Sequence, residues 1–366
     1  MKVIIFGGSF DPIHNGHILV AKKAMHHLKA KRVYFLPAKH PRWKKNTTND
    51  QQRLEMLQIA LKDHSWAKID LSEINSSENI NYTYDTMLKI KSEHPKDELY
   101  FLIGTDQLNL LDQWYKIDEL SKLVKIVCIA RPSFEINETN VEKYNVEIIK
   151  DTVSDVSSTS VRSLRSLDIP LGVFNYIVKN NLYFMEKYKS YFSEKRFKHS
   201  ISVSKLAYKI ASSNHLPTGK ALLAALLHDI GKEQPLDMQY EYLLKNYPEM
   251  KNNLSRELYH QFYSVKIAKE VFKIKDKEVL EAIKYHATGN ENMSKIAKII
   301  YASDKIDPLR GYDSSYMVNE CIDNIEVGFK LVLSENIRFL KENHKDFKNP
   351  LTLKCIDFYL GKGKLR

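Results

Sequence analysis

The sequence has little cysteine and no long apolar run. Its three cysteines, Cys128, Cys321 and Cys355, lie far apart and form no CxxC pair. This spacing argues against a disulfide framework or a zinc ribbon and suits a reducing compartment. No apolar stretch approaches the roughly 20 residues of a membrane span, and the first residues lack the apolar core and cleavage site of a signal peptide. We therefore expect a cytoplasmic protein that does not enter a membrane.

The length of the chain and a change of pattern along it predict two domains. A chain of 366 residues is long enough for two domains, and a hydrophobic fraction of 43% can supply each with a hydrophobic core. Strand and helix patterns alternate through the first half, whereas only helical periodicity follows from residue 191. We predict an α/β domain of residues 1–186 and an all-α domain of residues 187–366, with a short, stiff junction at residues 186–190. The expected helix breaks are Pro217, Pro235, Pro248, Gly289 and Pro308.

The formal net charge of +11 has two interpretations. A strongly basic chain can bind nucleic acid. A lysine-rich, solvated surface that also attracts anionic nucleotides gives the same net charge. The sequence has no compact stripe of basic and aromatic residues, so we favour the second interpretation and expect no nucleic-acid partner.

The first half predicts a mostly parallel, Rossmann-like sheet. Apolar runs typical of strands cover residues 3–6, 32–36, 67–71, 99–103, 125–129 and 146–149, the last as an edge strand. Helical patterns cover residues 18–28, 52–61 and 84–92. Strands that alternate with helices form a parallel sheet, and such sheets bind ligands at the carboxyl ends of their strands.

A glycine-rich turn between the first strand and the first helix is the most informative stretch. It begins with Gly7, Gly8, Ser9 and Phe10 and continues to two histidines, His14 and His17. Backbone NH groups at a helix start attract phosphate, and glycines let the backbone approach it. Histidines at i and i+3 can both face one anion and stabilise the charge on a transferring phosphoryl group. Each feature alone is often a cap or a surface residue, but the whole string is specific.

Polar residues at other predicted strand ends suit the rest of a nucleotide. Lys44 follows the second strand and could reach a polyphosphate. Asp106 follows the fourth strand, where a carboxylate can hold a ribose hydroxyl, and Trp114 beyond it can stack on a flat ring, although a tryptophan is more often a core residue. A later element contains Ser157, Ser158, Thr159 and Arg162. Hydroxyl groups entering a helix are ordinary N-caps, yet with an arginine one turn on they also suit the phosphates of ATP.

These motifs together resemble nucleotidyltransferases that adenylylate a phosphate monoester with ATP, and most closely the nicotinate-nucleotide adenylyltransferases. The resemblance covers roughly residues 1–186. It implies that Trp114 lies against the pyridine ring, that Thr83 and Gly104 belong to the mononucleotide pocket, and that Arg131 matches a family position. Trp43, where the family has histidine before the lysine, is a departure that concerns only local loop contacts.

The implied reaction is adenylyl transfer. The phosphate of nicotinate mononucleotide attacks the α-phosphorus of ATP and pyrophosphate leaves. His14 and His17 would serve the transition state, while Lys44 and Arg162 would serve the triphosphate. ATP would bring Mg²⁺, which its phosphates can hold without a protein carboxylate pair.

The helical half carries a second set of chemical groups. A lone histidine in a helix is usually a surface or hydrogen-bonded residue, but His228 and Asp229 follow an apolar run, and a buried carboxylate needs a partner or a metal. The candidate residues lie in five segments, one of which holds both His228 and Asp229. Each segment lies on a different predicted helix or near its end. The residues are His199, His228, Asp229, His260, His286 and Asp304.

This set resembles the HD phosphohydrolase superfamily, and most closely the bacterial symmetrical diadenosine-tetraphosphate hydrolases, over roughly residues 190–366. The resemblance implies one metal ion on His199, His228, Asp229 and Asp304, and a second on His260 and His286, with Asp229 bridging. The mixture of histidine and aspartate suits iron, with manganese as the alternative. Lys232 would be catalytic, and Arg196 and Arg310 would contact substrate. The implied reaction splits diadenosine tetraphosphate into two ADP.

The sequence leaves several alternatives open. The first half could prefer nicotinamide mononucleotide, and the second could act on other nucleotide polyphosphates. The helical half could instead be a nucleotide-binding regulator, although a pure sensor need not keep every metal ligand. Residue patterns do not reveal the native metal, the coupling between the domains or whether the chain forms a homo-oligomer.

Overall fold

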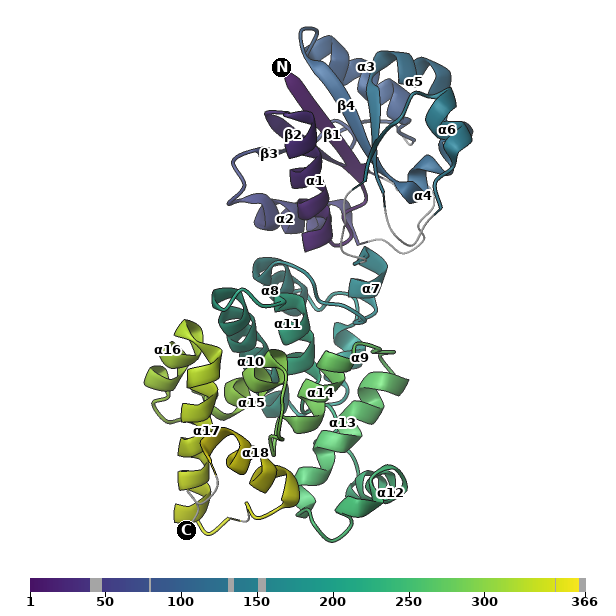
Figure 1. The fold of residues 1–366 in the computed structure, drawn as a ribbon. Coiled ribbons are helices and arrows are strands. Elements are labelled where there is room, and N and C mark those ends of the chain that lie inside the picture. The colour runs from purple at the N-terminus through teal and green to yellow at the C-terminus, as the bar shows by residue number, and fades with distance from the viewer. Residues whose placement is uncertain (40–47, 79, 131–134, 151–155, 346, 362–366) are drawn as a thin grey trace. The chain divides into compact units, whose positions relative to one another are not determined.

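The computed structural model describes residues 1–39, 48–78, 80–130, 135–150, 156–345 and 347–361 (Figure 1). The chain forms two compact units. One comprises Met1–Val161 and Gly172–Tyr176, and the other comprises Arg162–Leu171 and Ile177–Arg366. Packing therefore assigns residues 177–186 to the helical unit. The domain boundary between residues 186 and 187 stays a prediction. Two of the predicted binding residues, Lys44 and Arg131, lie outside the described residues.

The first unit is built on a parallel sheet. In the described part of the chain it has six strands in the order β3-β2-β1-β4-β5-β6, and every neighbouring pair is parallel (Figure 1). The strands are β1 (Lys2–Gly8), β2 (Arg32–Pro37), β3 (Ala67–Ile69), β4 (Glu98–Gly104), β5 (Lys125–Ile129) and β6 (Glu147–Ile149). The chain runs outward from β1 to β3 and then returns to β4 beside β1. The carboxyl ends of β1 and β4 therefore flank the switch point, where such sheets bind ligands.

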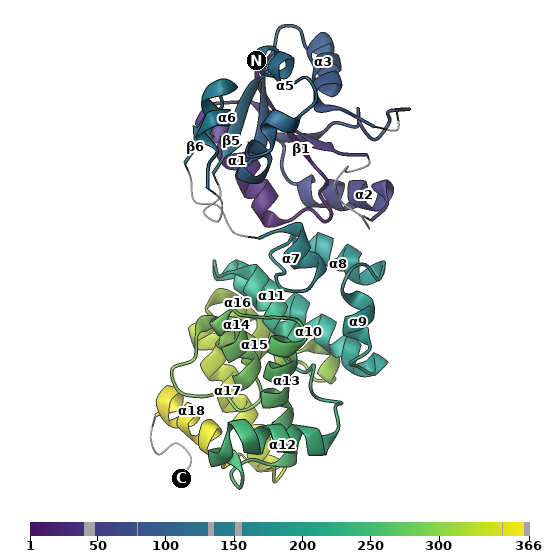
Figure 2. The same cartoon turned by 90° about the vertical axis from the view of Figure 1, so that its right-hand side faces the viewer.

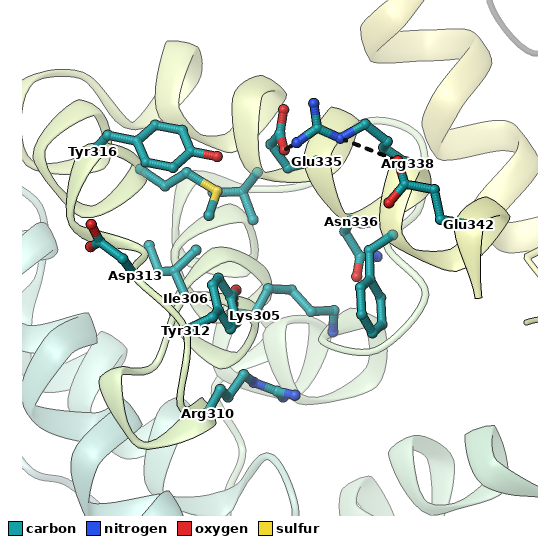
Figure 3. Close-up of a pocket in the computed structure, with 13 residues that line it drawn as sticks. Lys305, Ile306, Arg310, Tyr312, Asp313, Tyr316, Glu335, Asn336, Arg338 and Glu342 are labelled. Carbon is teal, nitrogen blue, oxygen red and sulfur yellow. Dashed lines mark hydrogen bonds and ion pairs between the residues drawn. The ribbon is translucent and has the colours of Figure 1, made fainter.

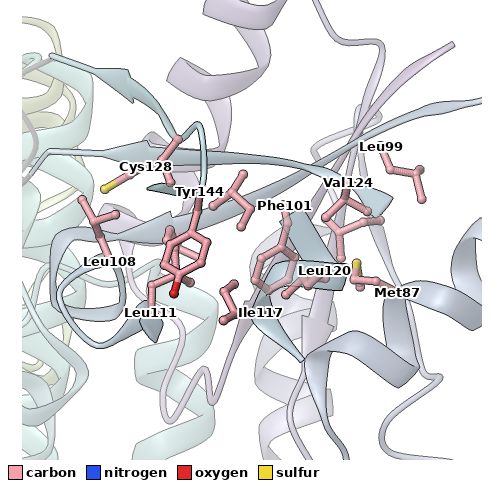
Figure 4. Packing of buried hydrophobic residues seen from close by; sticks show 14 of the residues in the cluster. Met87, Leu99, Phe101, Leu108, Leu111, Ile117, Leu120, Val124, Cys128 and Tyr144 are labelled. Atoms are coloured by element: carbon pink, nitrogen blue, oxygen red, sulfur yellow. The ribbon is translucent and has the colours of Figure 1, made fainter. Parts of the chain in front are cut away.

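Helices cover this sheet, which explains why its central strands are apolar throughout. Val3, Ile4 and Ile5 of β1 are all buried, as expected for a strand covered on both faces. One core joins Phe101 of β4 to Ile117 and Leu120 (Figure 4). The helices of residues 1–161 are α1 (Asn15–Leu28), α2 (Asp50–Leu61), α3 (Thr83–Glu93), α4 (Thr105–Leu108), α5 (Ile117–Leu123) and α6 (Glu138–Lys143), with a 3₁₀ turn η1 (Leu111–Gln113). The helices α7 (Ser158–Arg162) and α8 (Leu171–Lys179) each have residues in both units.

The second unit is helical throughout its described residues (Figure 2). Its central helix α10 packs against α11 and α15. The elements are α9 (Met185–Lys189), α10 (Glu194–Ser213), α11 (Thr218–Leu227), α12 (Leu236–Asn246), η2 (Pro248–Met250), η3 (Arg256–Leu258), α13 (Tyr259–Glu270), α14 (Lys277–Tyr285), α15 (Lys295–Lys305), η4 (Pro308–Arg310), α16 (Ser315–Asp323), α17 (Ile325–Glu342) and α18 (Pro350–Leu360).

The predicted helix breaks are confirmed, and the short, stiff junction at residues 186–190 stays a prediction. Pro217 and Pro235 occupy the N-caps of α11 and α12, and Gly289 has a positive φ of 69° just beyond α14. Residues 186–190, in contrast, lie within or next to α9. The Tyr188 side chain is buried, and its hydroxyl donates a hydrogen bond to the Leu226 carbonyl at 2.7 Å. Among the described residues, no helix combines the length and the apolar character needed to span a bilayer.

Glu73, in the loop after β3, is a buried acid that should make the stability of the fold depend on pH. Burial raises its pKa to about 7, despite a hydrogen bond donated by the Thr86 hydroxyl at 3.2 Å. Between pH 4.5 and 7 the folded chain keeps this proton and the unfolded chain loses it, so stability falls as pH rises. We expect Glu73→Gln to be more stable than the wild type at pH 8 by about 2–3 kcal/mol, with no such gain at pH 4.

Thermal unfolding of the full-length chain across this pH range measures the difference between wild type and variant. The matched control is Glu78→Gln, because Glu78 is an exposed glutamate in the same loop. A Glu73→Gln variant whose stability stays parallel to the wild type at every pH would contradict the prediction.

Candidate functional sites

The turn after β1 is held from several sides. The carbonyl of Gly8 accepts a hydrogen bond from the Ala38 NH at 3.0 Å. Phe10 takes a left-handed backbone conformation with φ of 46°. Its ring is buried against Phe35 and lies edge-on to His17, with centroids 5.6 and 5.1 Å away. The turn therefore has a fixed course and brings the start of α1 to the carboxyl end of β1.

The two predicted catalytic histidines of this turn lie together. The rings of His14 and His17 stack with centroids 3.6 Å apart and an interplanar angle of 27°. The His14 NH donates a hydrogen bond to Nδ1 of His17 at 3.2 Å. In neutral His17 this leaves the ring proton on Nε2 as a donor. The pair can thus present hydrogen-bond donors to an anion at the start of α1.

A buried arginine that the sequence did not single out connects this turn to the loop after β2. Arg53, on α2, donates hydrogen bonds to the carbonyls of Ser9 at 2.6 Å and Ala38 at 2.5 Å. Its charge is balanced by Asp50, 2.5 Å away. Nothing in the sequence predicts that Arg53 is buried, since an arginine is rarely fully buried unless its charge is paired. Arg53 fixes the two loops that follow neighbouring strands.

Gly16 lies where the segment leading into the serine-rich element, at Val156, meets the start of α1. A Cβ at Gly16 would lie 2.6 Å from Cγ1 of Val156 and 3.0 Å from Nδ1 of His14. The Ser158 hydroxyl donates a hydrogen bond to the Pro12 carbonyl at 3.0 Å. The absence of a side chain at residue 16 therefore allows the chain near residue 156 to pack against the histidine pair.

We expect Gly16→Ala to destabilise the first unit by about 1–3 kcal/mol and to lower adenylyl transfer. The sign is informative, because alanine normally stabilises a helix relative to glycine by about 1 kcal/mol. The double variant Gly16→Ala/Val156→Ala removes the atom that clashes and should recover much of the stability. Thermal unfolding and turnover measure both effects. A Gly16→Ala chain at least as stable as the wild type would refute the proposed close packing.

Four further residues were predicted to contact a nucleotide: Thr83, Gly104, Asp106 and Trp114. Asp106 lies in α4, directly after β4, and is partly exposed, as is Thr83 at the start of α3. The Trp114 ring is half-buried and lies edge-on to Phe101, with centroids 6.0 Å apart. Trp114 therefore contacts the hydrophobic core along one edge of its ring, as expected of a tryptophan that serves as a core residue. Gly104 is the last residue of β4, beside the switch point.

The serine-rich element has local structural roles. The Ser157 hydroxyl accepts a hydrogen bond from the Ser160 NH at 3.1 Å, and the Ser160 hydroxyl accepts one from the Ser157 NH at 3.1 Å. This reciprocal arrangement is an N-cap of α7, as the plain interpretation of these residues predicted. Thr159 is exposed and Arg162 is partly exposed at the last residue of the helix.

In the helical unit the predicted ligand segments come together at one buried centre. His199 lies on α10, His260 on α13 and Asp304 on α15, while His228 and His286 follow the last residues of α11 and α14. Two groups are close enough to hold a metal ion. They are His199 with His228 and Asp229, and Asp229 with His260 and His286. Asp229 belongs to both groups, as expected of a bridging ligand.

The interatomic distances around Asp229 and Asp304 support this grouping. Oδ1 of Asp229 lies 3.1 Å from Nε2 of His260 and 3.3 Å from Nε2 of His286. Its other oxygen, Oδ2, lies 3.6 Å from Nε2 of His228. Oδ1 of Asp304 lies 3.2 Å from Nε2 of His199 and 3.8 Å from Nε2 of His228. Six side chains from five segments of the chain thus direct oxygen and nitrogen atoms into one small volume.

Three of the histidines have the same orientation, which leaves Nε2 facing the centre. Nδ1 of His228, His260 and His286 each lies 2.6 to 2.7 Å from the backbone carbonyl three residues earlier. A carbonyl can only accept, so Nδ1 carries the proton and Nε2 carries the lone pair. Nε2 of His228 is buried and has no hydrogen-bond partner among the described residues. Burial lowers the pKa of His228 to about 4. Neutral, oriented imidazoles beside two carboxylates fit a divalent metal ion.

Cations surround the two carboxylates. Arg196 lies 2.8 Å from Oδ2 of Asp229, and Asp304 is contacted by Lys305 at 2.9 Å and by Arg310 at 2.6 Å. Nζ of Lys232 lies 3.0 Å from Nδ1 of His260. All four cationic side chains, including those predicted to act on substrate, therefore border the centre.

Asp307 is a further residue of this centre that the sequence analysis did not single out. It is fully buried, and its Oδ2 lies 2.7 Å from Nδ1 of His199. Burial alone would lower the pKa of His199, but its hydrogen bonds to Asp304 and Asp307 outweigh that effect and raise the pKa to about 9. The i, i+3 spacing of Asp304 and Asp307 was the signal available in the sequence, because it brings both carboxylates to one end of α15.

Comparisons with known proteins match each unit separately and the chain as a whole. Residues 5–164 match the cytidylyltransferase-like family, and residues 196–309 match the HD domain. The HD match and the ligand groups above together imply that this unit binds divalent metal.

Relatives with both units are found in mycoplasmas. A Mycoplasma genitalium protein named as a probable nicotinate-nucleotide adenylyltransferase/Ap4A hydrolase is 34% identical, over 84% of this chain and 88% of its own length. A Mycoplasma pneumoniae protein of the same name is 31% identical, over 93% of this chain and all of its own. The nicotinate-nucleotide adenylyltransferase of Bacillus subtilis is 35% identical, over 50% of this chain and 98% of its own.

Proposed function

The chain belongs to the family of nicotinate-nucleotide adenylyltransferase/Ap4A hydrolases, and from that premise we propose that it is a bifunctional enzyme. The first unit transfers AMP from ATP to nicotinate mononucleotide, giving deamido-NAD and pyrophosphate. The helical unit hydrolyses diadenosine tetraphosphate to two ADP. The observation that carries the second activity is the convergence of His199, His228, Asp229, His260, His286 and Asp304 on one centre.

In the first reaction the chain acts by positioning and by stabilising charge. The glycine-rich turn, with Gly7, Gly8, Ser9 and Phe10, approaches the ATP phosphates. His14 and His17 donate hydrogen bonds to the phosphoryl oxygens as charge develops on them. Their 3.6 Å stacking supports a shared target. The substrate ATP carries Mg²⁺.

Other residues of the predicted domain of residues 1–186 hold the two nucleotides. Lys44, Arg162 and the element with Ser157, Ser158 and Thr159 serve the triphosphate. The Asp106 carboxylate accepts from a ribose hydroxyl at the carboxyl end of β4, and Trp114 offers its open face to the pyridine ring. Thr83, Gly104 and Arg131 complete the mononucleotide pocket.

In the helical unit the ligands divide between two metal ions, which we assign as iron, or manganese in its place. His199, His228, Asp229 and Asp304 would hold one, and His260 and His286 would hold the other with Asp229 between them. Such a pair of ions supplies a hydroxide near neutral pH and a clamp for phosphoryl oxygens. Asp307 orients His199 through Nδ1. Arg196, Lys232 and Arg310 are placed to balance substrate phosphates.

The same residues favour catalysis over a purely regulatory role for the helical unit. A sensor would need cations for nucleotide phosphates but not a set of neutral imidazoles fixed by backbone carbonyls.

The three cysteines are free and buried, which supports the proposal of a cytoplasmic enzyme.

Turnover of the full-length chain against a panel of nucleotides, with bound metals measured, tests the proposal. We expect nicotinate mononucleotide to be adenylylated with a higher kcat/KM than nicotinamide mononucleotide. Diadenosine tetraphosphate should give ADP alone, whereas an asymmetric cleavage would give AMP and ATP. A chain that adenylylates neither mononucleotide, or that hydrolyses the dinucleotide at full rate when free of metal, contradicts the corresponding half.

A further inference from the structure

Figure 3 shows a pocket of the helical unit, whose volume is about 550 Å³. It lies between the end of α15, the segment around η4, and the helices α16 and α17. This volume is within the range of sites for small ligands. Two of its lining residues, Lys305 and Arg310, are the cations that contact Asp304. The pocket and the metal centre therefore share one wall.

The shared wall is suited to phosphate. Lys305 and Arg310 each place a cationic nitrogen within 3 Å of an Asp304 oxygen. The Tyr312 hydroxyl donates a hydrogen bond to the Lys305 carbonyl at 2.5 Å, which fixes the tyrosine ring at the same side of the pocket. Anionic oxygens of a ligand that reaches the metal centre from this pocket would pass these two cations.

The rest of the lining has a different chemistry. Arg338 is balanced by Glu335 and Glu342, so it adds no net positive charge. Two large aromatic side chains, Tyr316 and Phe339, are each half-exposed although they line the pocket. Neither ring fills the core, and Nζ of Lys345 lies 5.2 Å from the centroid of the Phe339 ring.

Hydrogen-bonding groups accompany these rings. Asn336 donates from its amide nitrogen to the Tyr301 hydroxyl at 3.0 Å, which orients the carboxamide. The carboxylates of Asp313 and Glu335 also line the pocket (Figure 3). Carboxylate oxygens can accept from ribose hydroxyls or from an exocyclic amine. The pocket thus changes from cationic beside the metal centre to aromatic and hydrogen-bonding farther away.

We propose that this pocket is the subsite for one nucleoside of the nucleotide polyphosphate that is cleaved at the metal centre. The assignment rests on the hydrolase activity proposed above. The base stacks on Phe339 or Tyr316, the ribose faces the acidic groups, and the phosphate chain passes Lys305 and Arg310. A ligand with a flat uncharged ring at one end and phosphates at the other matches this gradient, whereas inorganic polyphosphate would leave the aromatic end unused.

Steady-state kinetics of the full-length chain with diadenosine tetraphosphate test the subsite. Phe339→Ala should raise KM by about 10-fold, because a base–aromatic stack contributes about 1–3 kcal/mol, and Phe339→Tyr should restore it. The matched control is Phe358→Ala on α18, since Phe358 is 51% exposed and Phe339 is 50% exposed. A KM rise in Phe339→Ala alone supports the subsite. Equal KM values in wild type, Phe339→Ala and Phe358→Ala would overturn it.

Photolabelling with 8-azido-ADP separates this proposal from the proposed reaction. Peptide mapping should place adducts of the helical unit within residues 306–342. Adducts in that unit that lie only outside this stretch, or no adducts in that unit, would overturn the subsite even if hydrolysis is observed. A chain that is labelled at residues 306–342 but does not cleave the dinucleotide would keep the subsite and refute the hydrolase activity.

Discussion

His17→Ala is expected to lower adenylyl transfer by roughly 10²–10³-fold or more while the chain stays folded. The His17 ring stacks on His14 and accepts a hydrogen bond from the His14 NH through Nδ1. Alanine removes the Nε2 donor that we assign to the transferring phosphoryl group. Because a transition-state contact is lost, the fall should appear mainly in kcat.

The control for this variant is His26→Ala. His26 lies on the same helix, α1, and its side chain is exposed. It should keep the wild-type rate, and circular dichroism should show that both variants are folded. Pyrophosphate release with ATP and nicotinate mononucleotide measures the effect. Near-wild-type turnover by His17→Ala would defeat the assignment of the histidine pair.

Asp229→Asn is expected to remove most of the bound metal and to lower dinucleotide hydrolysis by at least roughly 10³-fold. Asp229 belongs to both ligand groups, so its replacement should affect both of the proposed ions. Asparagine keeps the shape of the side chain but has no negative charge to offset two cations. It also leaves Arg196, now 2.8 Å from Oδ2 of Asp229, without its carboxylate partner.

Metal content per chain and ADP formation are the two measurements for this variant. Asp237→Asn is the matched control, because Asp237 is an exposed aspartate in the first turn of α12. His286→Gln provides a second variant that should lose metal while Asp229 is retained. Full metal content together with full hydrolysis in Asp229→Asn would be incompatible with a bridging role.

Much of this architecture could be predicted because its signals are local. The apolar run at β1, the glycines after it and the proline breaks act within a few residues of where they stand in the sequence. The edge strand β6 and the starts of α11 and α12 after Pro217 and Pro235 follow from the same patterns. Of the candidate metal ligands, His228 and Asp229 were indicated by their place after an apolar run, because a buried carboxylate needs a partner or a metal. The rest of the set came from the family resemblance.

What could not be predicted depends on long-range packing. The sequence does not distinguish Arg53 from an exposed arginine on a helix. Only the fold brings it to the carbonyls of Ser9 and Ala38. Glu73 becomes a buried acid because α3 packs over its loop. The aromatic pocket joins Tyr316 and Phe339 from two different helices, and no spacing in the sequence relates them. The resemblance to known families identified the chemistry without locating these contacts.

The central claim is that one chain performs phosphate chemistry at two separate sites. The most direct test measures both activities, deamido-NAD formation and ADP formation from diadenosine tetraphosphate, in full-length wild type, His17→Ala and Asp229→Asn. We predict that each variant loses one activity and keeps the other at close to the wild-type rate. Loss of both activities in both variants, or of neither in either, would contradict the claim.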